Sequence, residues 1–574
     1  MRLFTFLFAS FCSTIVAAQN LKSGGKLIPE QANMDIRHYA LTLTVDPDQQ
    51  TINGFTEIKM NLASEADVIV LDLVHLLKVS QVWVNGKKAT VEHIGDRLYI
   101  RSDKKFTAGP QLVKVAYGGK PGIAERAPWI GGFQWEKDSK GNPWISITCQ
   151  GEGAKIYFPC KDHPSDEPNE GADLYITVPK GLTVAGPGLL KKVTHKGGQS
   201  TFHWKTNYTI SNYCILFNVG KYKLVTRDYI SVDGNKIPMH FYVLEENVDK
   251  APYHLELLEQ SCRVLEKYFG EYPWAKEKIG IAETPHLGME HQTMNAYGNK
   301  FKYVKLGGKD FDWLLHHEFG HEWWANKVTN RDWGHMWIQE GICTYGDALI
   351  VRELEGEEAY LARMRETARN AGNKLPIVQG DEVDSDQAYY GDIYGKGAYF
   401  MHTIRYVMGD ELFFPTLKKL ATDPKYTYDN TVVTSDVEQL FSGAYGKSLK
   451  PLFDLFLYTT NKLEVAVRQL KDDNYEIKLL NLDMTIPMQV ETDKGIQTIQ
   501  VGKEPVKFGS TKGLRVDPVG YYMKKGNDGI AGLVFVRQAA RTLNTVIPSV
   551  SKPGHSVSLQ PHVKALTPRS YYSL

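Results

Sequence analysis

Residues 30 to 225 alternate between hydrophobic and polar side chains in short runs. From Tyr39 to Val45 the hydrophobic residues recur at every second position, which is the period of a strand with one buried face. Turn signals such as Asn85-Gly86 and Gly118-Gly119 separate these runs. The pattern predicts that this part of the chain folds as a β domain.

The period changes at about residue 250. Apolar residues from Leu255 to Phe269 recur at helical spacing and Gly270 follows them, so we expect a helix that ends at this glycine. Residues 278 to 293 return to a strand pattern, and residues 310 to 460 have a mostly helical pattern. This order of elements predicts a mixed domain in which strands precede helices.

Strand patterns return from about 461 to 526, as in Leu463 to Val467, and predict a small β module. The last segment, from Gly529, contains several basic residues and no acidic residue. We expect a poorly ordered tail there, and a basic docking segment is the alternative.

Composition fits a globular protein, and its net charge says little about the partner. The chain has 574 residues, of which 42% are hydrophobic and 23% are charged, enough apolar content for several globular domains. Lysine and arginine total 67 against 66 acidic residues, which gives a net charge of +1. This balance gives no reason to expect nucleic acid or an anionic membrane as the main partner.

Residues 1–18 contain one arginine, an apolar run and small residues ahead of Gln19. This pattern is typical of a cleaved signal peptide, so we expect a secreted or periplasmic protein whose mature chain begins near Gln19. A membrane anchor is the alternative, but Ser10, Ser13 and Thr14 interrupt an already short run. No later stretch is long and apolar enough to span a membrane, so we expect no transmembrane anchor.

Removal of the signal leaves five cysteines, an odd number without the spacing of a disulfide framework. We therefore do not expect disulfides to hold the fold together. One disulfide, between Cys149 and Cys160, is possible, but the sequence does not decide whether it forms.

The strongest chemical signal is the segment His317-Glu318-Phe319-Gly320-His321, which Glu340 follows after eighteen further residues. On a helix the two histidines lie one turn apart on one face, where two imidazoles converge on one tetrahedral ion. Glu318 flanks them closely enough to act on a metal-bound water, and Glu340 completes the ligand set. A chance pair of histidines is the alternative, and a second glutamate at this spacing makes it rare. The segment predicts a zinc peptidase centre.

The stretch from His317 to Asp347 resembles the gluzincin aminopeptidases, the zinc family that includes alanyl aminopeptidases and the leukotriene-hydrolase aminopeptidase. Three further segments agree with this resemblance. Leu287 to His291 is similar to the Gly-x-Met-Glu-Asn exopeptidase motif, and Tyr394 to Gly397 is similar to the Tyr-x-Lys-Gly segment. Cys149 to Asp162 is similar to the N-terminal-domain segment that reaches into the active site. The resemblance covers most of residues 30 to 460.

The resemblance implies one zinc ion per chain, held by His317, His321 and Glu340, with a fourth position for water. Glu318 is then the general base, which accepts a proton from the water and passes it to the leaving amine. Tyr394 is implied to stabilise the oxyanion, a role in which one donor contributes about 3 kcal/mol. Three neighbouring tyrosines are alternatives for that role, because only the following Lys-Gly pair singles out Tyr394: Tyr389, Tyr390 and Tyr399.

The resemblance also implies how the enzyme selects peptide substrates with a free N-terminus. Glu290 pairs with the ammonium of the first residue, and Gln150 is similar to a second contact with the same amine. Gly288 and Met289 precede Glu290 on an expected edge strand, which pairs with the substrate backbone. His291 is a departure, because the family usually has asparagine there.

Lys155 is a second departure: the family commonly has arginine there, so no arginine-specific role is assigned to it. Asp347, seven residues beyond Glu340, is a candidate to orient a zinc-bound imidazole, with an exposed carboxylate as the alternative. The run from Asp384 to Tyr389 is similar to a segment that lines the lipid-epoxide site of the leukotriene hydrolase. That similarity makes an epoxide hydrolase side-activity an alternative. This activity also uses a C-terminal helical domain, which we do not expect in this chain.

Together these observations predict an α+β multidomain protein with an N-terminal β-sheet domain, a thermolysin-like zinc catalytic domain and a small C-terminal β module. The expected segments are a signal peptide at 1–18, the β domain at 19–225, the catalytic domain at 226–460, the β module at 461–528 and a basic tail at 529–574. We expect a zinc-dependent aminopeptidase that hydrolyses the N-terminal residue from peptides. A zinc endopeptidase, an epoxide hydrolase side-activity and an inactive binding scaffold are the alternatives.

Overall fold

A computed structural model gives the fold of residues 21–525, apart from residues 472 and 512. These described residues belong to one compact unit of the chain. The signal peptide expected at 1–18 and the basic tail expected at 529–574 lie outside the described residues. Among the described helices, none is long and apolar enough to cross a membrane.

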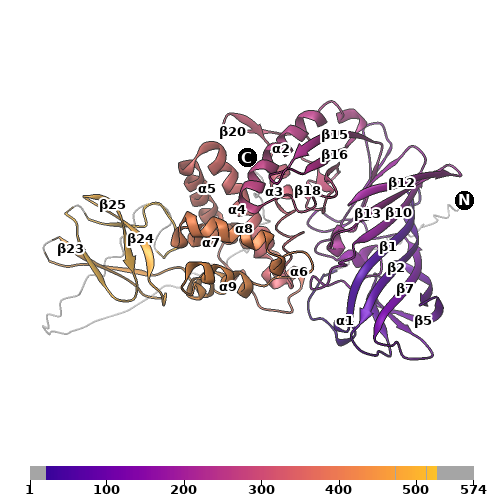
Figure 1. Ribbon diagram of the computed structural model, residues 1–574, viewed down its shortest axis with the longest axis horizontal. Coiled ribbons are helices and arrows are strands. Elements are labelled where there is room, and N and C mark those ends of the chain that lie inside the picture. The colour runs from indigo at the N-terminus through magenta and orange to yellow at the C-terminus, as the bar shows by residue number, and fades with distance from the viewer. Residues whose placement is uncertain (1–20, 472, 512, 526–574) are drawn as a thin grey trace, which may run out of the picture. The chain divides into compact units, whose positions relative to one another are not determined.

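The first part of the chain forms two β-sheets (Figure 1). The larger sheet has ten strands in the order β12-β13-β10-β1-β2-β7-β4-β5-β6-β3, and the smaller has four in the order β11-β14-β9-β8. Along β1, Leu41, Leu43 and Val45 are buried and the threonines between them are half-buried, because alternate side chains of a strand point to opposite faces. The predicted β domain is therefore confirmed. Its elements are α1 (Pro29–Ala32), β1 (Met34–Asp46), β2 (Thr51–Leu62), β3 (Ile69–Asp72), β4 (Lys78–Val84), β5 (Lys87–Ile94), β6 (Arg97–Arg101), β7 (Gly109–Gly119), β8 (Gly132–Lys137), β9 (Pro143–Thr148), η1 (Ala154–Ile156), β10 (Ala172–Pro179), β11 (Thr183–Ala185), β12 (Leu189–Lys196), β13 (Gln199–Thr206), η2 (Asn212–Cys214) and β14 (Asn218–Gly220).

A five-stranded sheet, in the order β15-β16-β17-β19-β18, begins the second part of the chain. β15 pairs with β16 from Tyr222 to Ile230, so the boundary expected between residues 225 and 226 falls inside a strand. The five-stranded sheet therefore begins at Tyr222. Its strands and the short hairpin that follows them are β15 (Tyr222–Ile230), β16 (Lys236–Leu244), β17 (Ile279–Glu283), β18 (Gly288–Met289), β19 (Asn295–Tyr297), β20 (Val304–Leu306) and β21 (Lys309–Phe311).

Helices make up most of the rest of this part, as the sequence pattern predicts. The predicted helix that ends at Gly270 is confirmed as α2 (Ala251–Phe269). Gly270 has a φ of 90°, a conformation that glycine adopts without the steric cost of a side chain, and the helix stops there. The other helices are η3 (Glu245–Asn247), α3 (Trp313–Gly320), η4 (Trp333–His335), α4 (Trp337–Glu355), α5 (Glu357–Asn370), α6 (Ser385–Ala388), α7 (Asp392–Met408), α8 (Asp410–Thr422), η5 (Pro424–Tyr426), α9 (Thr434–Tyr445) and α10 (Lys450–Leu457).

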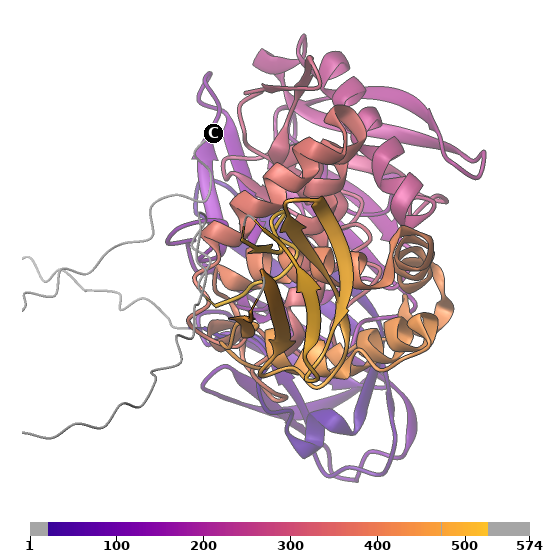
Figure 2. The same ribbon diagram turned by 90° about the vertical axis from the view of Figure 1, so that its left-hand side faces the viewer.

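Strands return after α10 and form the predicted small β module (Figure 2, yellow). They make two three-stranded sheets, in the orders β22-β23-β26 and β25-β24-β27. The five cysteines of the described residues are all free and buried, so Cys149 and Cys160 do not form a disulfide in this structure. The module's strands are β22 (Val465–Gln469), β23 (Asn474–Leu479), β24 (Ile486–Thr492), β25 (Gly495–Val501), β26 (Val506–Gly509) and β27 (Arg515–Val516).

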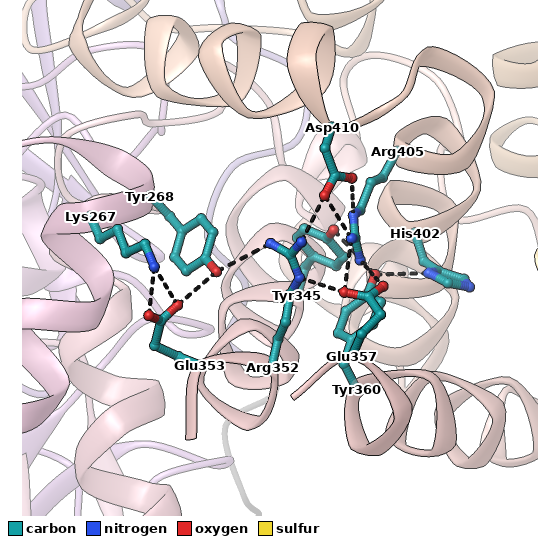
Figure 3. Close-up of polar contacts among 10 residues, drawn as sticks. All are labelled: Lys267, Tyr268, Tyr345, Arg352, Glu353, Glu357, Tyr360, His402, Arg405 and Asp410. Atoms are coloured by element: carbon teal, nitrogen blue, oxygen red, sulfur yellow. Dashed lines mark hydrogen bonds and ion pairs between the residues drawn. The ribbon is translucent and has the colours of Figure 1, made fainter. Parts of the chain in front are cut away.

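Four helices are joined by a ring of two arginines and two carboxylates (Figure 3). Arg405 of α7 contacts Asp410 of α8 at 2.7 Å and Glu357 of α5 at 2.9 Å. Arg352 of α4 contacts the same two carboxylates, at 2.7 and 2.6 Å. The Arg405 side chain is only 9% exposed, so the ring fixes α4 and α7 relative to each other from a nearly buried charge. These are the helices that carry Glu340 and Tyr394.

Replacing Arg405 with methionine is expected to lower the free energy of unfolding by about 2 kcal/mol, because two carboxylates lose their main cation. The expected loss is below the roughly 3–5 kcal/mol of a fully buried pair because both carboxylate side chains are partly exposed. Chemical denaturation of the parent and the variant measures it. Arg468→Met, which removes an exposed ion pair to Glu476 on the β module, is the control and should change stability by less than about 1 kcal/mol. An equal loss in both variants would contradict a special role for the ring.

The same ring makes part of the stability depend on pH. Burial raises the pKa of Asp410 and Glu357, but the hydrogen bonds and charges of Arg405 and Arg352 together outweigh it and bring each pKa below its ordinary value of 3.8 or 4.5. A carboxyl with a lowered pKa stabilises the fold above its ordinary pKa and loses this contribution as the pH falls. The stability difference between the parent and Arg405→Met should therefore shrink below pH 4.5.

Candidate active site

The first two candidate ligands lie at the end of α3. The Asp312 side chain caps this helix by accepting a hydrogen bond from the backbone N–H of Leu315 at 3.2 Å. His317 lies in the last turn and His321 directly follows the helix, so one turn separates the two rings. Their Nε2 atoms lie 3.2 Å apart. Local helix geometry alone therefore brings the two imidazoles together.

Glu340 reaches the same point from the first turn of α4. Its Oε2 atom lies 3.3 Å from Nε2 of His321 and 3.8 Å from Nε2 of His317. The three side chains are nearly or fully buried. The structure thus brings together all three residues that the sequence proposes as metal ligands.

The hydrogen bonds on the far side of each ring indicate which nitrogens face inward with lone pairs. Nδ1 of His317 lies 2.9 Å from an oxygen of Asp347, and Nδ1 of His321 lies 2.7 Å from the backbone oxygen of Trp324. Because each Nδ1 faces an acceptor, it carries the proton, and each Nε2 is left with a lone pair. Asp347 is therefore positioned to orient a ligand ring, as such carboxylates do at metal sites.

Two inward lone pairs and a buried carboxylate oxygen need a cation between them. Oε2 of Glu340 is buried and accepts no hydrogen bond from any described residue. Two imidazole nitrogens and one carboxylate oxygen form a donor set that zinc accepts in catalytic sites, with one position left for water or substrate. The residues therefore fit a zinc ion.

Cys343 also lies close to the two histidines. Its sulfur and one ring nitrogen of each histidine all lie within 4.8 Å of one another. The thiol donates to the backbone oxygen of His317 at 3.1 Å, and it lies one turn beyond Glu340 on α4. This contact occupies the thiol, so Glu340 stays the third ligand. Sequence reasoning missed Cys343, although the helical spacing of residues 340, 343 and 347 places all three on one face.

Glu318 lies beside the ligands and is 8% exposed. One oxygen of Glu318, one of Glu290 and one ring nitrogen of His321 all lie within 4.8 Å of one another. Burial raises the pKa of Glu318 to about 8, with the nearby imidazoles opposing this shift. Gly288 makes the approach possible, because a Cβ at that position would meet the Glu318 carboxylate at 2.8 Å.

Glu290 is 3% exposed and accepts two hydrogen bonds at the same oxygen. Gln150 donates through Nε2 at 2.6 Å, and Tyr213 donates through its hydroxyl at 2.9 Å. Burial raises the pKa of the Glu290 carboxyl. The structure thus unites Glu290 with Gln150, 140 residues away in the chain. Tyr213 was missed, because no local pattern marks a contact with a residue so distant in sequence.

Gly288 and Met289 form β18, the edge strand of the five-stranded sheet. β18 pairs with β19 through Gly288 with Tyr297 and Met289 with Ala296. No other described strand pairs with its outer edge. That edge can therefore hydrogen-bond an extended peptide backbone.

The four candidate tyrosines have different contacts in the structure. The Tyr394 ring lies 6.2 Å from the His317 ring, and its hydroxyl lies 2.6 Å from the Tyr389 hydroxyl. Tyr390 donates to backbone oxygens of Leu375 and Pro376, and Tyr399 donates to the backbone of Gly520 at 2.6 Å. Tyr394 is thus the member of this group whose ring lies near a candidate metal ligand, and Tyr389 contacts Tyr394.

The departures from the family motif occupy buried positions. Lys155 forms an ion pair with Asp162 at 2.8 Å and donates to the backbone oxygen of Lys22, so it has structural partners. His291 is 1% exposed, and neither of its ring nitrogens has a hydrogen-bond partner among the described residues. Burial lowers the pKa of His291, so the ring is neutral.

The residues Lys22–Gly25, which we call the N-terminal strap, lie against the loop that holds Gln150. The backbone N–H of Ser23 donates to the backbone oxygen of Gly151 at 2.8 Å. The Ser23 hydroxyl donates to Asp162 at 3.0 Å. The strap therefore braces the loop directly after Gln150.

The other side of the strap is bonded to the segment before Tyr389. The backbone N–H of Ser385 donates to the backbone oxygen of Ser23 at 3.0 Å, and Gly25 donates to Val383 at 3.2 Å. Lys22 pairs with Asp384 and Asp386, each at 3.3 Å. The strap thus joins two loops that flank the candidate site. The sequence carries no signal for these contacts, which connect residues more than 100 positions apart.

Comparison with known proteins agrees with this geometry. The model of the Peptidase family M1 domain matches residues 253–456, and that of the Peptidase M1 N-terminal domain matches residues 36–214. Together the matches cover most of the chain, which belongs to the M1 peptidase family.

Curated relatives include a leucyl aminopeptidase of Saccharolobus solfataricus, 22% identical over 82% of this chain and 60% of the relative. The leukotriene A-4 hydrolase of Xenopus laevis is 24% identical over 68% of this chain and 65% of its own length. The chain therefore spans less than two thirds of these relatives.

Among solved structures, an M1 zinc metallopeptidase from Deinococcus radiodurans has the same fold, with a TM-score of 0.63 at 22% identity. The match covers 75% of this chain and 94% of the other. A mutant of that protein bound to a Tyr-Ser-Ala substrate matches at the same TM-score.

Gly288→Ala is expected to lower kcat/KM for peptides by about 100-fold, since the new methyl group displaces Glu318 or the edge strand, and small misplacements carry costs of this size. Steady-state kinetics and thermal unfolding measure the two effects. Gly443→Ala, in open space on α9, is the control and should keep full activity. Full activity in Gly288→Ala would show that the close approach does not matter.

Gly24→Ala is expected to raise KM for free-amine peptides and to lower kcat/KM about 10-fold. Gly24 has a φ of 75°, and its new Cβ would meet the Trp333 ring at 2.4 Å, so the strap must shift. Gly86→Ala is the control, because that glycine has a φ of 77° but no atom within 4 Å of the added carbon. If both variants behave alike, the strap has no role in the site.

Proposed function

We propose that this protein is a zinc-dependent aminopeptidase that hydrolyses the N-terminal residue from peptides. The observation that carries the proposal is the close approach of Glu290, Glu318 and the ligand His321, whose polar atoms lie within 4.8 Å of one another. This arrangement places an amine-binding carboxylate beside a base and a metal ligand. The relatives named as aminopeptidases support it.

Glu290 explains the selection of a free N-terminus. It is buried, and its described hydrogen-bond donors, Gln150 and Tyr213, are both neutral. A buried carboxylate is costly without a cation, and the ammonium of a peptide's first residue supplies one. In a longer chain lying across the site, a neutral amide would stand at this position and leave the charge unpaired. The pair thus favours removal of one residue at a time.

The chemical step uses three further groups. Bound zinc supplies Lewis-acid polarisation of the scissile carbonyl and activation of a water molecule. Glu318 accepts the proton of the attacking water and returns it to the leaving amine. Tyr394 donates a hydrogen bond to the carbonyl oxygen as negative charge develops there. The outer edge of β18 pairs with the substrate backbone, which holds the first peptide bond in place without selecting its side chains.

Two alternatives predict different behaviour. A zinc endopeptidase shares the ligands but has no use for Glu290 and Gln150. An epoxide hydrolase side-activity also uses a basic residue from a C-terminal helical domain, and from Val465 to Val516 the described elements are strands only. The aminopeptidase therefore accounts for more of the arrangement than either alternative.

The proposal is tested with the peptide Ala-Phe-Ala, with its N-terminus free or acetylated, with and without a zinc chelator. We expect chelator-sensitive release of alanine from the free peptide only, with activity restored by added zinc. Glu290→Gln should reduce this preference, because its amide no longer pairs with an ammonium. Efficient cleavage of the acetylated peptide would make the protein an endopeptidase, and cleavage of neither would reject the proposal.

Tyr394→Phe checks the oxyanion role separately. Loss of one donor to the transition state should lower kcat about 100-fold and leave KM nearly unchanged. Tyr390→Phe is the control, because its hydroxyl bonds to the backbone of residues 375 and 376. A larger loss in the control than in Tyr394→Phe would remove Tyr394 from the mechanism.

We further propose that residues 1–18 are a cleaved signal peptide and that the mature protein is secreted or periplasmic. The arginine, apolar run and small residues ahead of Gln19 support this. Cleavage there leaves the whole strap in the mature chain. Fractionation of the producing cells, with N-terminal sequencing of the product, should find a chain that begins near Gln19 outside the cytoplasm. An uncut chain in the cytoplasm would reject the proposal.

A further inference from the structure

A cavity of about 640 Å³ lies apart from the metal ligands, none of which lines it. Its wall brings together segments around residues 207–209, 233–235, 271–276, 327 and 422–429. The mechanism proposed above uses none of these residues. The side chains that line the cavity nevertheless include charged groups that form no ion pair.

Lys327 supplies a nearly buried positive charge to the cavity. The residue is 6% exposed, and its ammonium lies 5.2 Å from the centre of the Tyr428 ring. Among the described residues this ammonium forms no ion pair and no hydrogen bond, although the charge of Glu271 acts on it through space. Burial lowers the pKa of Lys327 to about 8, against an opposing effect of Glu271, so the side chain is still mostly charged at neutral pH. A desolvated cation without an anion is costly, and a bound anion removes that cost.

An aromatic wall next to Lys327 is already in place. Tyr208 and Tyr428 stack with ring centres 6.0 Å apart and an angle of 18° between the planes. The Trp274 ring meets both edge-on, at 5.2 and 5.7 Å. The Tyr428 hydroxyl donates to the backbone oxygen of Pro273 at 3.1 Å, and its N–H donates to the backbone oxygen of Lys327 at 2.9 Å. These contacts fix the ring beside the cation, where it can cover the apolar part of a ligand.

Carboxylates also line the cavity. Asp233 and Asp429 are exposed and Glu271 is half-buried. Their recorded partners are neutral: Asn235 donates to Glu271 at 2.6 Å, and the Thr209 hydroxyl donates to Asp429. In the described part of the chain, none of these three carboxylates forms an ion pair. The cavity therefore combines a nearly buried cation with three more exposed carboxylates that form no ion pair, and a second, exposed lysine, Lys276, also lines it.

We propose that this cavity binds a small zwitterion, with its carboxylate at Lys327 and its ammonium facing Asp233, Glu271 and Asp429. Each charge of such a ligand meets an unpaired charge of opposite sign, and a small side chain rests on the Tyr208 and Tyr428 rings. Free amino acids and short peptides share this chemistry. A simple anion satisfies the lysine but leaves the acidic groups unpaired, and a simple amine does the reverse.

Binding of L-alanine, N-acetyl-L-alanine and L-alaninamide, measured by titration calorimetry, tests the proposal. The zinc-loaded Glu290→Gln protein is the background, because it weakens binding of amines at the active site. We expect one molecule of L-alanine per chain, at least 10-fold weaker binding of the two blocked compounds, and at least 10-fold weaker L-alanine binding after Lys327→Met. Binding of dialanine shows which kind of zwitterion the cavity prefers. Tighter binding than L-alanine indicates a peptide ligand, and equal or weaker binding indicates a free amino acid.

Two further variants separate the role of Lys327 from a general effect on folding. Asp233→Asn should weaken binding of L-alanine but not of N-acetyl-L-alanine, because only the former presents an ammonium. Lys302→Met, at an exposed lysine outside the cavity, should leave all affinities unchanged. The proposal is overturned if L-alanine does not bind at millimolar concentration, or if it binds equally well after Lys327→Met. It is also overturned if inorganic phosphate binds through Lys327 and L-alanine does not. Because binding is measured directly, loss of peptidase activity leaves the result interpretable.

Discussion

The structure depends on one electrostatic requirement: two imidazole lone pairs and a buried carboxylate oxygen share a point that only a cation can satisfy. α3 supplies the imidazoles and α4 supplies Glu340, so the crossing of these helices fixes the donor set. The crossing of α4 and α7 positions Tyr394. A Cβ on Gly341 would lie 2.8 Å from Cα of Gly397, so α4 and α7 touch through their backbones. Gly341 follows Glu340 and Gly397 lies one turn beyond Tyr394. The two glycines therefore set how closely the tyrosine approaches the ligands.

Glu322 also holds the segment that follows Glu290. It follows His321 and accepts hydrogen bonds from the backbone of Thr293 at 3.0 Å and from Asn295 at 2.7 Å. These residues lie just after Glu290, so one buried side chain links the segment of His321 to the segment of Glu290. Fixed spacing matters because catalysis loses much of its rate when reacting groups shift by an ångström. The polar core beside α3 thus helps to fix Glu290 relative to the candidate metal ligands.

The sequence predicts those parts of the site that follow from local geometry. The histidine pair and Glu318 depend on helical spacing, which a pattern of three or four residues reveals. The glycine that ends α2 follows from a similar local rule, whereas the edge strand at Gly288 and the role of Asp347 were expected from the resemblance. Resemblance, rather than pattern, supplied Gln150. Contacts between residues far apart in the sequence have no local pattern. The hydrogen bonds from Tyr213 to Glu290 and from Ser23 to Gly151 depend on how whole sheets and loops pack together. The boundary expected at residue 225 falls inside β15 for the same reason, because strand pairing and not composition decides where a sheet begins.

The number of partners separates buried charges that hold the fold together from those that bind ligands. Glu322 is fully buried and accepts from five groups, which satisfy a carboxylate without a cation; they are Tyr272, Trp274, Thr293, Asn295 and Asn326. Glu290 is almost as buried but has two donors, both on one oxygen, so part of its hydrogen-bonding capacity faces the site. Lys327 forms no hydrogen bond and no ion pair with the described residues, and its ammonium lies beside the Tyr428 ring. Since an unsatisfied buried charge costs more than a satisfied one, a fold keeps such groups at a net loss of stability unless a ligand completes them. Glu322 is therefore structural, whereas Glu290 and Lys327 each mark a place where a charged ligand belongs.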